Sequence, residues 1–538
     1  NMNKNFGTDG EISFSGLLGY NQRRSSFQSI YASTNGGLVV PGVYALSNSV
    51  AAPEAPSENA NKIGVDGIYG QASIGYKNFL YVDLSARRDV SSTLPVENNA
   101  YFYPAASLSL IWSEFVDSDI LSFGKIRANW ANVGSDAPAN ALIDAYGIGT
   151  PFNGVTLASA PSTQNNSSLL PENTASRELG LEVKMFDNRV GFDVSAYNRS
   201  TKNQILPAQV STATGTYYKY VNAGQVDNQG YEVSGYITPV KTKDFQWDVS
   251  VNWSTNDNTV VELFGDSKSL LLGSVQGGVN ITARVGESYG TLEGTTFERD
   301  ASTGAPLIGA DHPGGRGGAW FHKGDIDVIG NVQADWRGGI NNAISYKNIR
   351  LSALLDAQWG GNFFSLDTYY GYGTGVYDFQ AGDNAAGNPI RTDLEDGGGL
   401  TFDEVADLGI EMPMQWDGVT VDSDGNPVGT EGSTSMWMND YYNLLGWKGG
   451  IAEMHIHDAS FVKLREVALT YTVPTSALAG LPVAGVDVSF VGRNLAILYK
   501  NTPWSDPEAG LSAGNLQGYQ SGAYPTLREV GVNLRVKF

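Results

Sequence analysis

Phe245-Gln-Trp-Asp-Val-Ser-Val-Asn-Trp-Ser254 alternates without a break between apolar residues at odd positions and polar residues at even positions. Successive side chains of a β-strand point to opposite faces, so the segment predicts a strand with one apolar and one polar face. An amphipathic helix would repeat its apolar residues every three or four positions instead. The segment therefore predicts β-structure in its part of the chain.

The same period of two recurs along the whole sequence. Residues 80–87, 190–196 and 349–359 alternate in this way, with Leu354 the one exception in the last segment. The pattern predicts about fourteen strands, each long enough to cross a bilayer when tilted. They lie near residues 11–24, 66–77, 79–90, 103–113, 123–133, 175–186, 188–199, 228–239, 244–257, 334–347, 349–359, 459–473, 484–495 and 526–538.

Long and short connections alternate between these strands. Long ones cover residues 25–65, 91–102, 134–174, 200–227, 258–333, 360–458 and 496–525, tight ones fall at Asn78, Asp187, 240–243 and Asn348, and modest ones at 114–122 and 474–483. Consecutive antiparallel strands place all the long connections at one rim. A soluble sandwich or propeller does not require this one-sidedness, whereas an outer-membrane barrel has short periplasmic turns and long extracellular loops.

We therefore predict an all-β chain that forms a transmembrane antiparallel β-barrel. Backbone groups in lipid must all be paired, which forces the sheet to close and turns its apolar face outward. The long loops are expected to be extracellular, and the C-terminus periplasmic. A soluble β-rich adhesin is the alternative, with the apolar face as its core.

Composition excludes several classes of function. The 538 residues contain no cysteine, which excludes disulfides, thiolate metal sites and cysteine nucleophiles. The formal net charge of -22, from 34 basic and 56 acidic residues, argues against nucleic acid as a partner. An uninterrupted apolar run of about 18 residues is missing, which excludes a membrane-spanning helix but not a barrel strand.

Two short motifs resemble catalytic or metal sites. Gly286-Glu-Ser-Tyr-Gly290 matches the nucleophile-elbow pattern, but its flanks read as loop, without the required strand and helix. His455 and His457 would share one face of a strand, with Glu453 and Asp458 close by. A surface metal site is conceivable there, but a solvated strand end is the favoured interpretation.

Two further segments resemble ligand-binding loops. Asp422–Asn426 has the first part of a calcium-loop spacing, but Pro427 follows and a hairpin turn is favoured. Gly371–Gly375 lacks the strand-to-helix context of a phosphate loop. We therefore predict no catalytic residue, no cofactor and no metal, and a protein that is not an enzyme.

The connection 360–458 concentrates aromatic residues among acids and glycines. Aromatic rings stack on sugars and hold extended peptides, and they equally pack a folded loop or contact a partner that acts as a lid. The candidates for contact with a substrate or lid are Tyr369, Tyr370, Tyr377, Trp416, Trp437, Tyr441, Tyr442 and Trp447.

The last strand is the most specific segment. Val530, Val532, Leu534, Val536 and Phe538 lie on one face, opposite the charged and polar residues of the other face. A chain that ends on an aromatic residue after such alternation resembles the C-terminal signal of the barrel-assembly machinery. An ordinary terminal strand would not require the final phenylalanine. We predict that Val532, Leu534, Val536 and Phe538 carry this signal.

An ordered series of motifs resembles the SusC/RagA-like TonB-dependent transporters of Bacteroidota. Asp458-Ala-Ser-Phe-Val-Lys-Leu-Arg-Glu-Val-Ala-Leu-Thr-Tyr-Thr-Val-Pro474 is similar to the late-barrel signature of that family. The other matches are Arg87–Ser92 (with Val90 where the family has glycine), Asn222-Ala-Gly224, Asn228–Val233, Ile329-Gly-Asn331, Gly492-Arg-Asn-Leu495, Asp506-Pro-Glu508 and Gly531–Phe538. Family members often carry an Asp-rich loop before the Ile-Gly-Asn motif, but Asp311–Trp320 is poor in oxygen ligands, so no metal is inferred.

The resemblance implies a barrel of about twenty-two strands around a plug. Residues 1–538 would be its C-terminal portion. The first strands, the plug, the TonB-contacting segment and the signal peptide would precede Asn1, in a piece that is cleaved, separately encoded or outside this sequence.

The function that the resemblance implies is TonB-dependent import of an oligomeric nutrient, a glycan or a peptide, across the outer membrane. A SusD-like surface lipoprotein would act as the lid, and TonB would act through the plug. Lipid and lipopolysaccharide would surround the barrel, and a dimer of transporter–lipoprotein pairs is left open. The alternatives are a siderophore-type TonB-dependent receptor and a passive porin or secretion-associated channel.

Overall fold

The structure is a computed structural model, and its largest element is one antiparallel sheet. The sheet has 16 strands among the described residues, and its main path follows the order of these strands along the chain. The described residues are 2–7, 11–301, 304, 306–311, 317–378, 381–390, 398, 400–401, 419–421, 427–430, 435–436, 446, 450–512, 514, 516–524 and 526–538.

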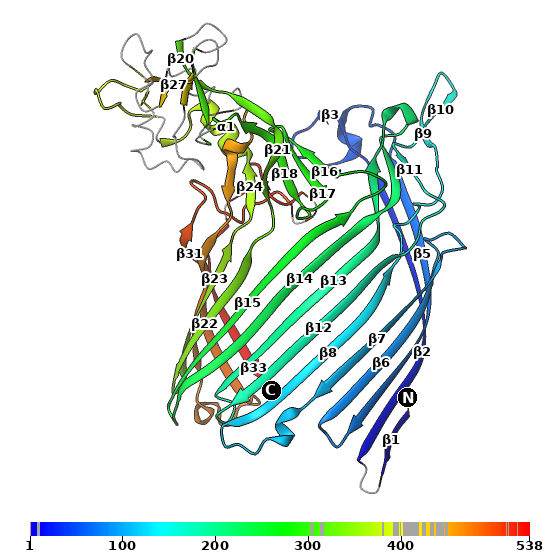
Figure 1. Cartoon of the computed structure of the whole chain (residues 1–538), viewed down its shortest axis with the longest axis vertical. Helices are drawn as coiled ribbons and strands as arrows, with labels where there is room; N and C mark the ends of the chain where they lie inside the picture. Colours follow the sequence, from blue (N-terminus) through cyan, green and yellow to red (C-terminus); the bar gives the residue numbers. More distant parts are fainter. Residues whose placement is uncertain are drawn as a thin grey trace.

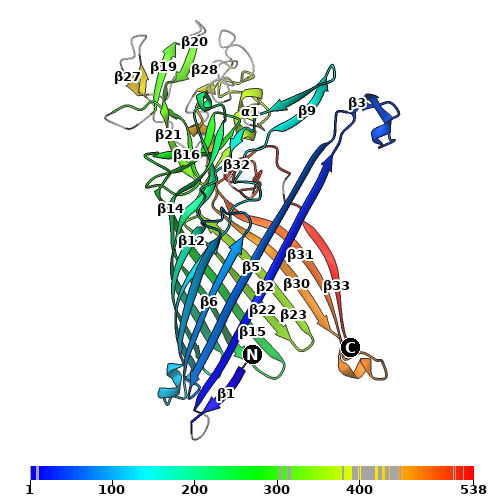
Figure 2. The ribbon, with the colours of Figure 1, turned by 90° about the vertical axis from the view of Figure 1, so that its right-hand side faces the viewer.

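The sheet curves into the wall of a barrel, with β1 at one edge and β33 at the other (Figures 1 and 2). Its main path runs through β1 (Met2–Phe6), β2 (Ile12–Tyr31), β5 (Ser57–Tyr76), β6 (Leu80–Ser91), β7 (Ala100–Leu110), β8 (Leu121–Ser135), β12 (Glu172–Met185), β13 (Val190–Gln209), β14 (Tyr218–Lys241), β15 (Phe245–Glu262), β22 (Trp336–Tyr346), β23 (Ile349–Trp359), β30 (Phe461–Thr472), β31 (Gly485–Lys500) and β33 (Glu529–Lys537).

All fourteen expected strands are present, and the predicted antiparallel barrel wall is confirmed. Several strands run further than their alternation indicated: β2 and β5 stay paired up to Tyr31 and Ser57, and β13 and β14 up to Gln209 and Tyr218. The connections expected at 25–65 and 200–227 are therefore largely strand. The short edge strand β1 was not expected.

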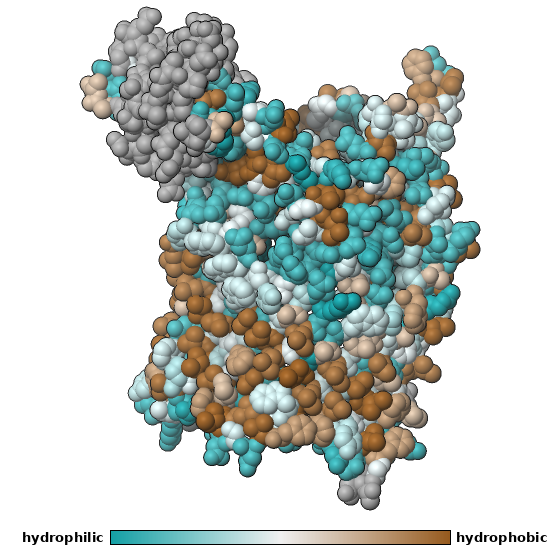
Figure 3. Space-filling model, viewed as in Figure 1, coloured by the Kyte–Doolittle hydropathy of each residue, from teal (hydrophilic) through white to brown (hydrophobic). Residues whose placement is uncertain are grey.

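The cross-strand register aligns the apolar residues of neighbouring strands in rows. Val251 of β15 pairs with Ile340 of β22, which pairs with Leu355 of β23. These side chains form the outward face of the wall, and Figure 3 shows apolar side chains gathered in a band over its lower part. Asn252 and Asp356 alternate with them and point into the lumen. The strands thus present an apolar outside and a polar inside, as a lipid-embedded barrel requires.

The tight turns lie at one rim and the long connections at the opposite rim, as Figure 1 shows. The turn from β5 to β6 places Lys77 and Asn78 at φ 47° and φ 61°, a conformation that asparagine tolerates and that matches the twist of a hairpin. Both ends of the chain lie near the rim of the tight turns. The predicted one-sided loop pattern is confirmed.

The connections of the loop rim fold into a layer with its own packing. The segment 258–333, expected to be a loop, contains a sheet of β16 (Ser269–Val275), β17 (Val279–Arg284), β18 (Thr291–Phe297) and β21 (Lys323–Asn331). Its buried core joins Ile281 and Leu292 to Phe364 and Tyr519 from later segments. Among the described residues, no helix is long and apolar enough to span a membrane.

The smaller elements lie off the main path of the sheet, and most belong to the loop layer. They are β3 (Asn35–Leu38), η1 (Leu46–Asn48), β4 (Ser49–Ala51), η2 (Trp112–Phe115), β9 (Gly147–Phe152), β10 (Val155–Ser159), β11 (Thr163–Gln164), η3 (Thr212–Thr214), β19 (Leu307–Asp311), β20 (Gly317–Phe321), β24 (Asn362–Ser365), α1 (Leu366–Thr374), β25 (Leu400–Thr401), β26 (Val419–Val421), β27 (Pro427–Thr430), β28 (Ser435–Met436), η6 (Glu453–His455), β29 (Ile456–Asp458), η7 (Thr475–Leu478) and β32 (Tyr519–Gln520).

Candidate functional site

The helix α1 organises the aromatic part of the loop layer. The Ser365 side chain caps its first turn by accepting a hydrogen bond from the Thr368 backbone, and Gly375 ends it in the left-handed conformation at φ 69°. Helix α1 carries Tyr369 and Tyr370, two of the predicted contact residues. The glycine-rich segment 371–375 lies in the second half and at the end of α1, not before its first turn, so it does not form a phosphate loop.

Tyr377, another predicted contact residue, follows α1 and packs inside the layer. Its ring stacks on Trp504 at 4.2 Å between centroids and meets the edge of Tyr372 at 5.4 Å. Tyr372 is only 1% exposed. Burial raises the pKa of Tyr377 to about 12. This side of α1 therefore joins the segment 366–378 to the last long connection.

Tyr369 and Tyr370 differ in their surroundings. The Tyr369 ring packs against Phe364 at 5.8 Å and against His455 at 5.2 Å. Tyr370 is 37% exposed, and the Gln276 amide donates a hydrogen bond to its hydroxyl. Of these tyrosines, Tyr370 presents the most accessible ring to a ligand.

The structure thus brings three of the predicted contact residues together around α1. The other five, Trp416, Trp437, Tyr441, Tyr442 and Trp447, lie outside the described residues. Sequence reasoning missed Tyr372, Trp504 and Tyr519, which complete the same cluster. The proximity of Trp504 to the Asp506-Pro-Glu508 motif is the signal that could have pointed to it.

His455 and His457 are buried beneath α1, so the predicted solvated strand end is wrong. They are 1% and 4% exposed, and each has a ring nitrogen 3.2 Å from the Thr368 hydroxyl. The hydroxyl belongs to α1, whose packing excludes water from both rings. Glu453 does not join them, because it binds Arg299 at 2.8 Å. Among the described residues, no group of three or more histidines and carboxylates is placed to hold a metal.

We expect the packing of α1 to weaken as the pH falls from 7 to 5. Burial lowers the pKa of His457 to about 4 and that of His455 well below its ordinary value. Below about pH 6.5 the unfolded segment binds more protons than the folded one, so stability is lost as the pH falls toward 4, by at most about 1.4 kcal/mol per pH unit and histidine. Protease cleavage within 366–378 should increase accordingly.

The double variant His455→Asn and His457→Asn provides the control for this pH effect. It removes both titrating rings while keeping a hydrogen-bonding side chain at each position. Cleavage at pH 5 relative to pH 7 should then rise much less than in the parent protein. An equal rise in both proteins would show that other groups control the opening of α1.

A buried ion-pair network lies on the lumen side of the wall, below α1. Lys463 of β30 binds Asp506 and Glu508, with its ammonium 2.5 Å from a carboxylate oxygen of each. Arg465 binds Glu508 and lies 2.7 Å from Asp356 of β23. These ion pairs therefore join two motifs that the sequence analysis identified separately, at 458–474 and 506–508.

A β-bulge lies beside this network. The pairing of β30 with both neighbours shifts register beside Arg465. Lys463 and Arg465 are two residues apart and so share the lumen side of the strand, and the bulge turns Glu466, which would otherwise point outward, to the same side. Burial by itself would raise the pKa of Glu508, but the hydrogen bonds from Arg465 and Lys463 hold it below its ordinary value.

A cavity of about 420 Å³ adjoins the network. Its lining combines charged and amide groups with aromatic rings, and it includes residues 507–510 and 517–520. The side chains that give it this character are Arg337, Asp356, Gln358, Phe363, Phe461 and Glu508. Such a lining suits a polar ligand with apolar faces, held by hydrogen bonds and by ring contacts.

The remaining candidate motifs do not form sites among the described residues. Gly286–Gly290 is a turn from β17 to β18, so a strand follows it and the elbow geometry is missing. Residues 422–426 and 312–316 lie outside the described residues.

Comparison with known proteins identifies the barrel. The family model described as "TonB dependent receptor-like, beta-barrel" matches residues 1–279. The chain belongs to this family. Members of the family are outer-membrane proteins, and the related transporters are not enzymes.

Relatives support the SusC/RagA-like resemblance within this family. TonB-dependent receptor P3 of Formosa agariphila is 25% identical over 568 residues, covering 100% of this chain and 51% of the relative. SusC of Bacteroides thetaiotaomicron is 26% identical over 217 residues, covering 37% of this chain and 21% of SusC. The chain thus spans about half the length of P3.

The fold is also that of a solved family structure. A structure of the RagAB peptide importer matches with a TM-score of 0.73 and 19% identity, covering 100% of this chain and 55% of the matched one. The predicted resemblance to SusC/RagA-like barrels is confirmed.

Proposed function

We propose that this chain forms part of a TonB-dependent importer that takes an oligomeric nutrient across the outer membrane. The observation that carries the proposal is a barrel wall, apolar outside, whose loop rim carries an exposed tyrosine and a polar cavity. Family membership supports this interpretation. A glycan or a peptide suits the mixed lining of the cavity, and the fold match to a peptide importer supports peptides as one candidate class.

The wall described here is proposed to be the C-terminal portion of the complete barrel. The outward edges of β1 and β33 have no partner strand among the described residues. Unpaired backbone groups in lipid cost several kcal/mol each, so further strands have to close the wall. The remainder of the barrel is proposed to supply those strands, the plug and the segment that contacts TonB.

The rim with the loop layer is proposed to be extracellular, where a SusD-like surface lipoprotein would cover it as a lid. The C-terminus is then periplasmic. Val532, Leu534 and Val536 are exposed on the outward face of β33, and the exposed Phe538 follows its last residue, which suits recognition by the barrel-assembly machinery. Deletion of Phe538 should lower the amount of folded barrel in the outer membrane. An unchanged amount would contradict this role.

Uptake by intact cells tests the proposed function. Cells that carry the complete protein should import a labelled glycan or peptide oligomer only when TonB is present. Import without TonB would indicate a passive channel, and TonB-dependent recovery of growth on iron chelates would indicate a siderophore receptor. Release from membranes without detergent would indicate a soluble adhesin.

We expect Tyr370→Ala to weaken binding of the imported oligomer. The substitution removes the exposed ring, whose stacking contributes about 0.5–1.5 kcal/mol, and so should raise the dissociation constant by roughly twofold to tenfold. Titration of the purified complete protein measures this constant. Tyr377→Phe is the matched control, because it keeps the ring on Trp504 and should leave affinity unchanged. If the Tyr370→Ala variant and the parent bound the oligomer with equal affinity, Tyr370 would not be part of the binding site.

A further inference from the structure

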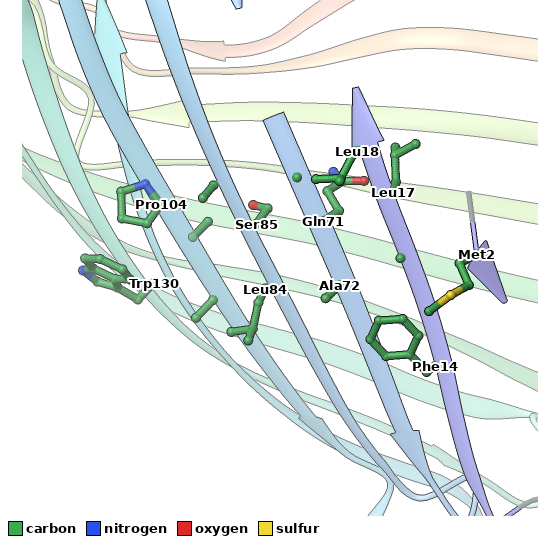
Figure 4. A pocket seen from close by; sticks show the side chains of 15 residues that line it. Met2, Phe14, Leu17, Leu18, Gln71, Ala72, Leu84, Ser85, Pro104 and Trp130 are labelled. Carbon is green, nitrogen blue, oxygen red and sulfur yellow. The ribbon is translucent and has the colours of Figure 1, made fainter. Parts of the chain in front are cut away.

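An apolar groove crosses the outward face of the wall from β1 to β8, as Figure 4 shows. Its volume is about 820 Å³, within the range of small-molecule sites. Bulky apolar side chains stand along it, namely Phe14, Leu18, Leu84 and Trp130. Leu18 is 86% exposed and Leu84 47% exposed, so the groove faces the surroundings of the barrel.

Small residues form the floor of the groove because the register aligns them across four strands. Gly16 pairs with Ala72, which lies opposite Leu84 and then Ala106. In the next row, Gly70 lies between Leu18 and Ala86. The floor is therefore fixed by the backbone pairing of the wall, not by a flexible loop.

Two of the bulky side chains lean over the glycines of the floor. A Cβ atom added to Gly16 would lie 3.1 Å from the Phe14 ring, and one added to Gly70 would lie 3.1 Å from Leu18. Both distances are too short for ordinary contact. The glycines thus permit the close approach that shapes the groove.

An arginine with no ion-pair partner among the described residues stands just beyond the end of the groove nearer the loop rim. Arg88 is exposed in the row beyond Ala86, with Ile68 and Phe102 as its cross-strand neighbours. Rows on one face of a strand are about 7 Å apart. Arg87 pairs with Asp89 and Arg24 with Asp66, whereas the described residues offer Arg88 no carboxylate within ion-pair distance.

The level of Arg88 marks the boundary of the apolar band on these strands. Its row contains the exposed rings of Tyr20 and Phe102, and the row after it brings the polar pair Gln22 and Asp66. Aromatic residues gather at the headgroup level of outer-membrane barrels. A cation at this depth meets lipid phosphates, while the groove beside it meets hydrocarbon.

We propose that the groove binds a phosphate-bearing membrane lipid, with an acyl chain along the small-residue floor and the phosphate at Arg88. The groove lies in the face that lipid covers, so acyl chains are the groups that surround it. Arginine forms bidentate, charge-assisted hydrogen bonds with phosphate, which selects anionic lipids over neutral ones.

A lipid fits this surface better than a second copy of the chain. A two-fold contact would place the same concave groove against itself and leave the space between the copies unfilled. An acyl chain is narrow and flexible, so it fills the groove without a void.

Native mass spectrometry of the complete protein in mild detergent tests the proposal. Phosphatidylglycerol and an uncharged diacylglycerol serve as the two probes. Ala72→Phe should lower the bound fraction of both more than about tenfold, because it fills the floor and displaces several methylene groups. Arg88→Gln should lower binding of phosphatidylglycerol alone, by roughly tenfold.

Matched variants keep the test interpretable. Ala353→Phe adds the same ring on the outward face of β23, away from the groove, and should bind both lipids like the parent. Ala106→Leu fills the floor from β7 if Ala72→Phe does not fold. Equal lipid binding by the floor variants and Ala353→Phe would overturn the groove as a lipid site. A floor variant that kept its lipid but separated two copies of the chain would show that the groove is a contact between copies. Unchanged phosphatidylglycerol binding in Arg88→Gln would overturn the role of the phosphate.

Discussion

Replacing Lys463 by methionine is expected to destabilise the docking of the last long connection, residues 501–528, by about 3–5 kcal/mol. The Lys463 side chain is 4% exposed and that of its partner Asp506 is 7% exposed. Removing the ammonium leaves the Asp506 carboxylate buried without its counter-ion, while Glu508 keeps only Arg465. The loss should appear as faster hydrogen exchange and protease cleavage within this connection.

Lys537→Met is the matched control for that experiment. Lys537 also carries an ion pair, with Asp487 at 3.7 Å, but its side chain is 52% exposed. Exposed pairs contribute about 0–1 kcal/mol, so the control should change exchange little. The double variant Lys463→Met and Asp506→Asn should recover part of the loss, because it removes the isolated charge. Similar behaviour of Lys463→Met and Lys537→Met would contradict the buried network.

Arginine at position 251 should destabilise the barrel in a bilayer by about 2–4 kcal/mol, whereas arginine at position 252 should change its stability little. Val251 lies in the middle of β15 on the outward face and is 42% exposed. A charge there would have to enter hydrocarbon. Asn252 is the next residue, and its side chain points into the polar lumen. Urea titration of the folded fraction in lipid vesicles measures the difference.

This pair of substitutions examines the assignment of the two faces directly. Both variants add the same side chain to neighbouring positions, so strand propensity and net charge are matched. Greater loss of stability at position 252 than at 251 would mean that the two faces of β15 are assigned the wrong way round. Equal losses would mean that neither face of β15 meets lipid.

The wall was predictable because lipid and lumen impose opposite demands on successive residues. Phe245–Ser254 therefore alternates between apolar and polar residues, and so do the other membrane-spanning segments. Beyond the bilayer the outward face no longer has to be apolar, so the paired extensions of β2 and β13 show no strict alternation. Met2–Phe6 has three consecutive polar residues, and the pairing that makes it a strand is tertiary.

The loop layer was less predictable, because its structure depends on contacts between distant segments. Leu366–Thr374 is rich in tyrosine and glycine, which favour helices weakly, and it is held by the Ser365 cap and the packing of Tyr372. The spacing of His455 and His457 indicated a shared side but not the helix that covers it. The ion pair between Lys463 and Asp506 likewise depends on how the connection 501–528 folds back into the lumen.

The length of β14 has a mechanical consequence. Its 24 residues extend roughly 80 Å along the strand, or about 60 Å along the membrane normal at a 40° tilt, against an apolar band of about 25 Å. It stays paired with β13 up to Tyr218, so the two strands extend together well above the headgroups. Ala208, Val221 and Ala223 of these two strands pack with Leu270 of β16, so the strands give the loop layer a rigid support above the bilayer.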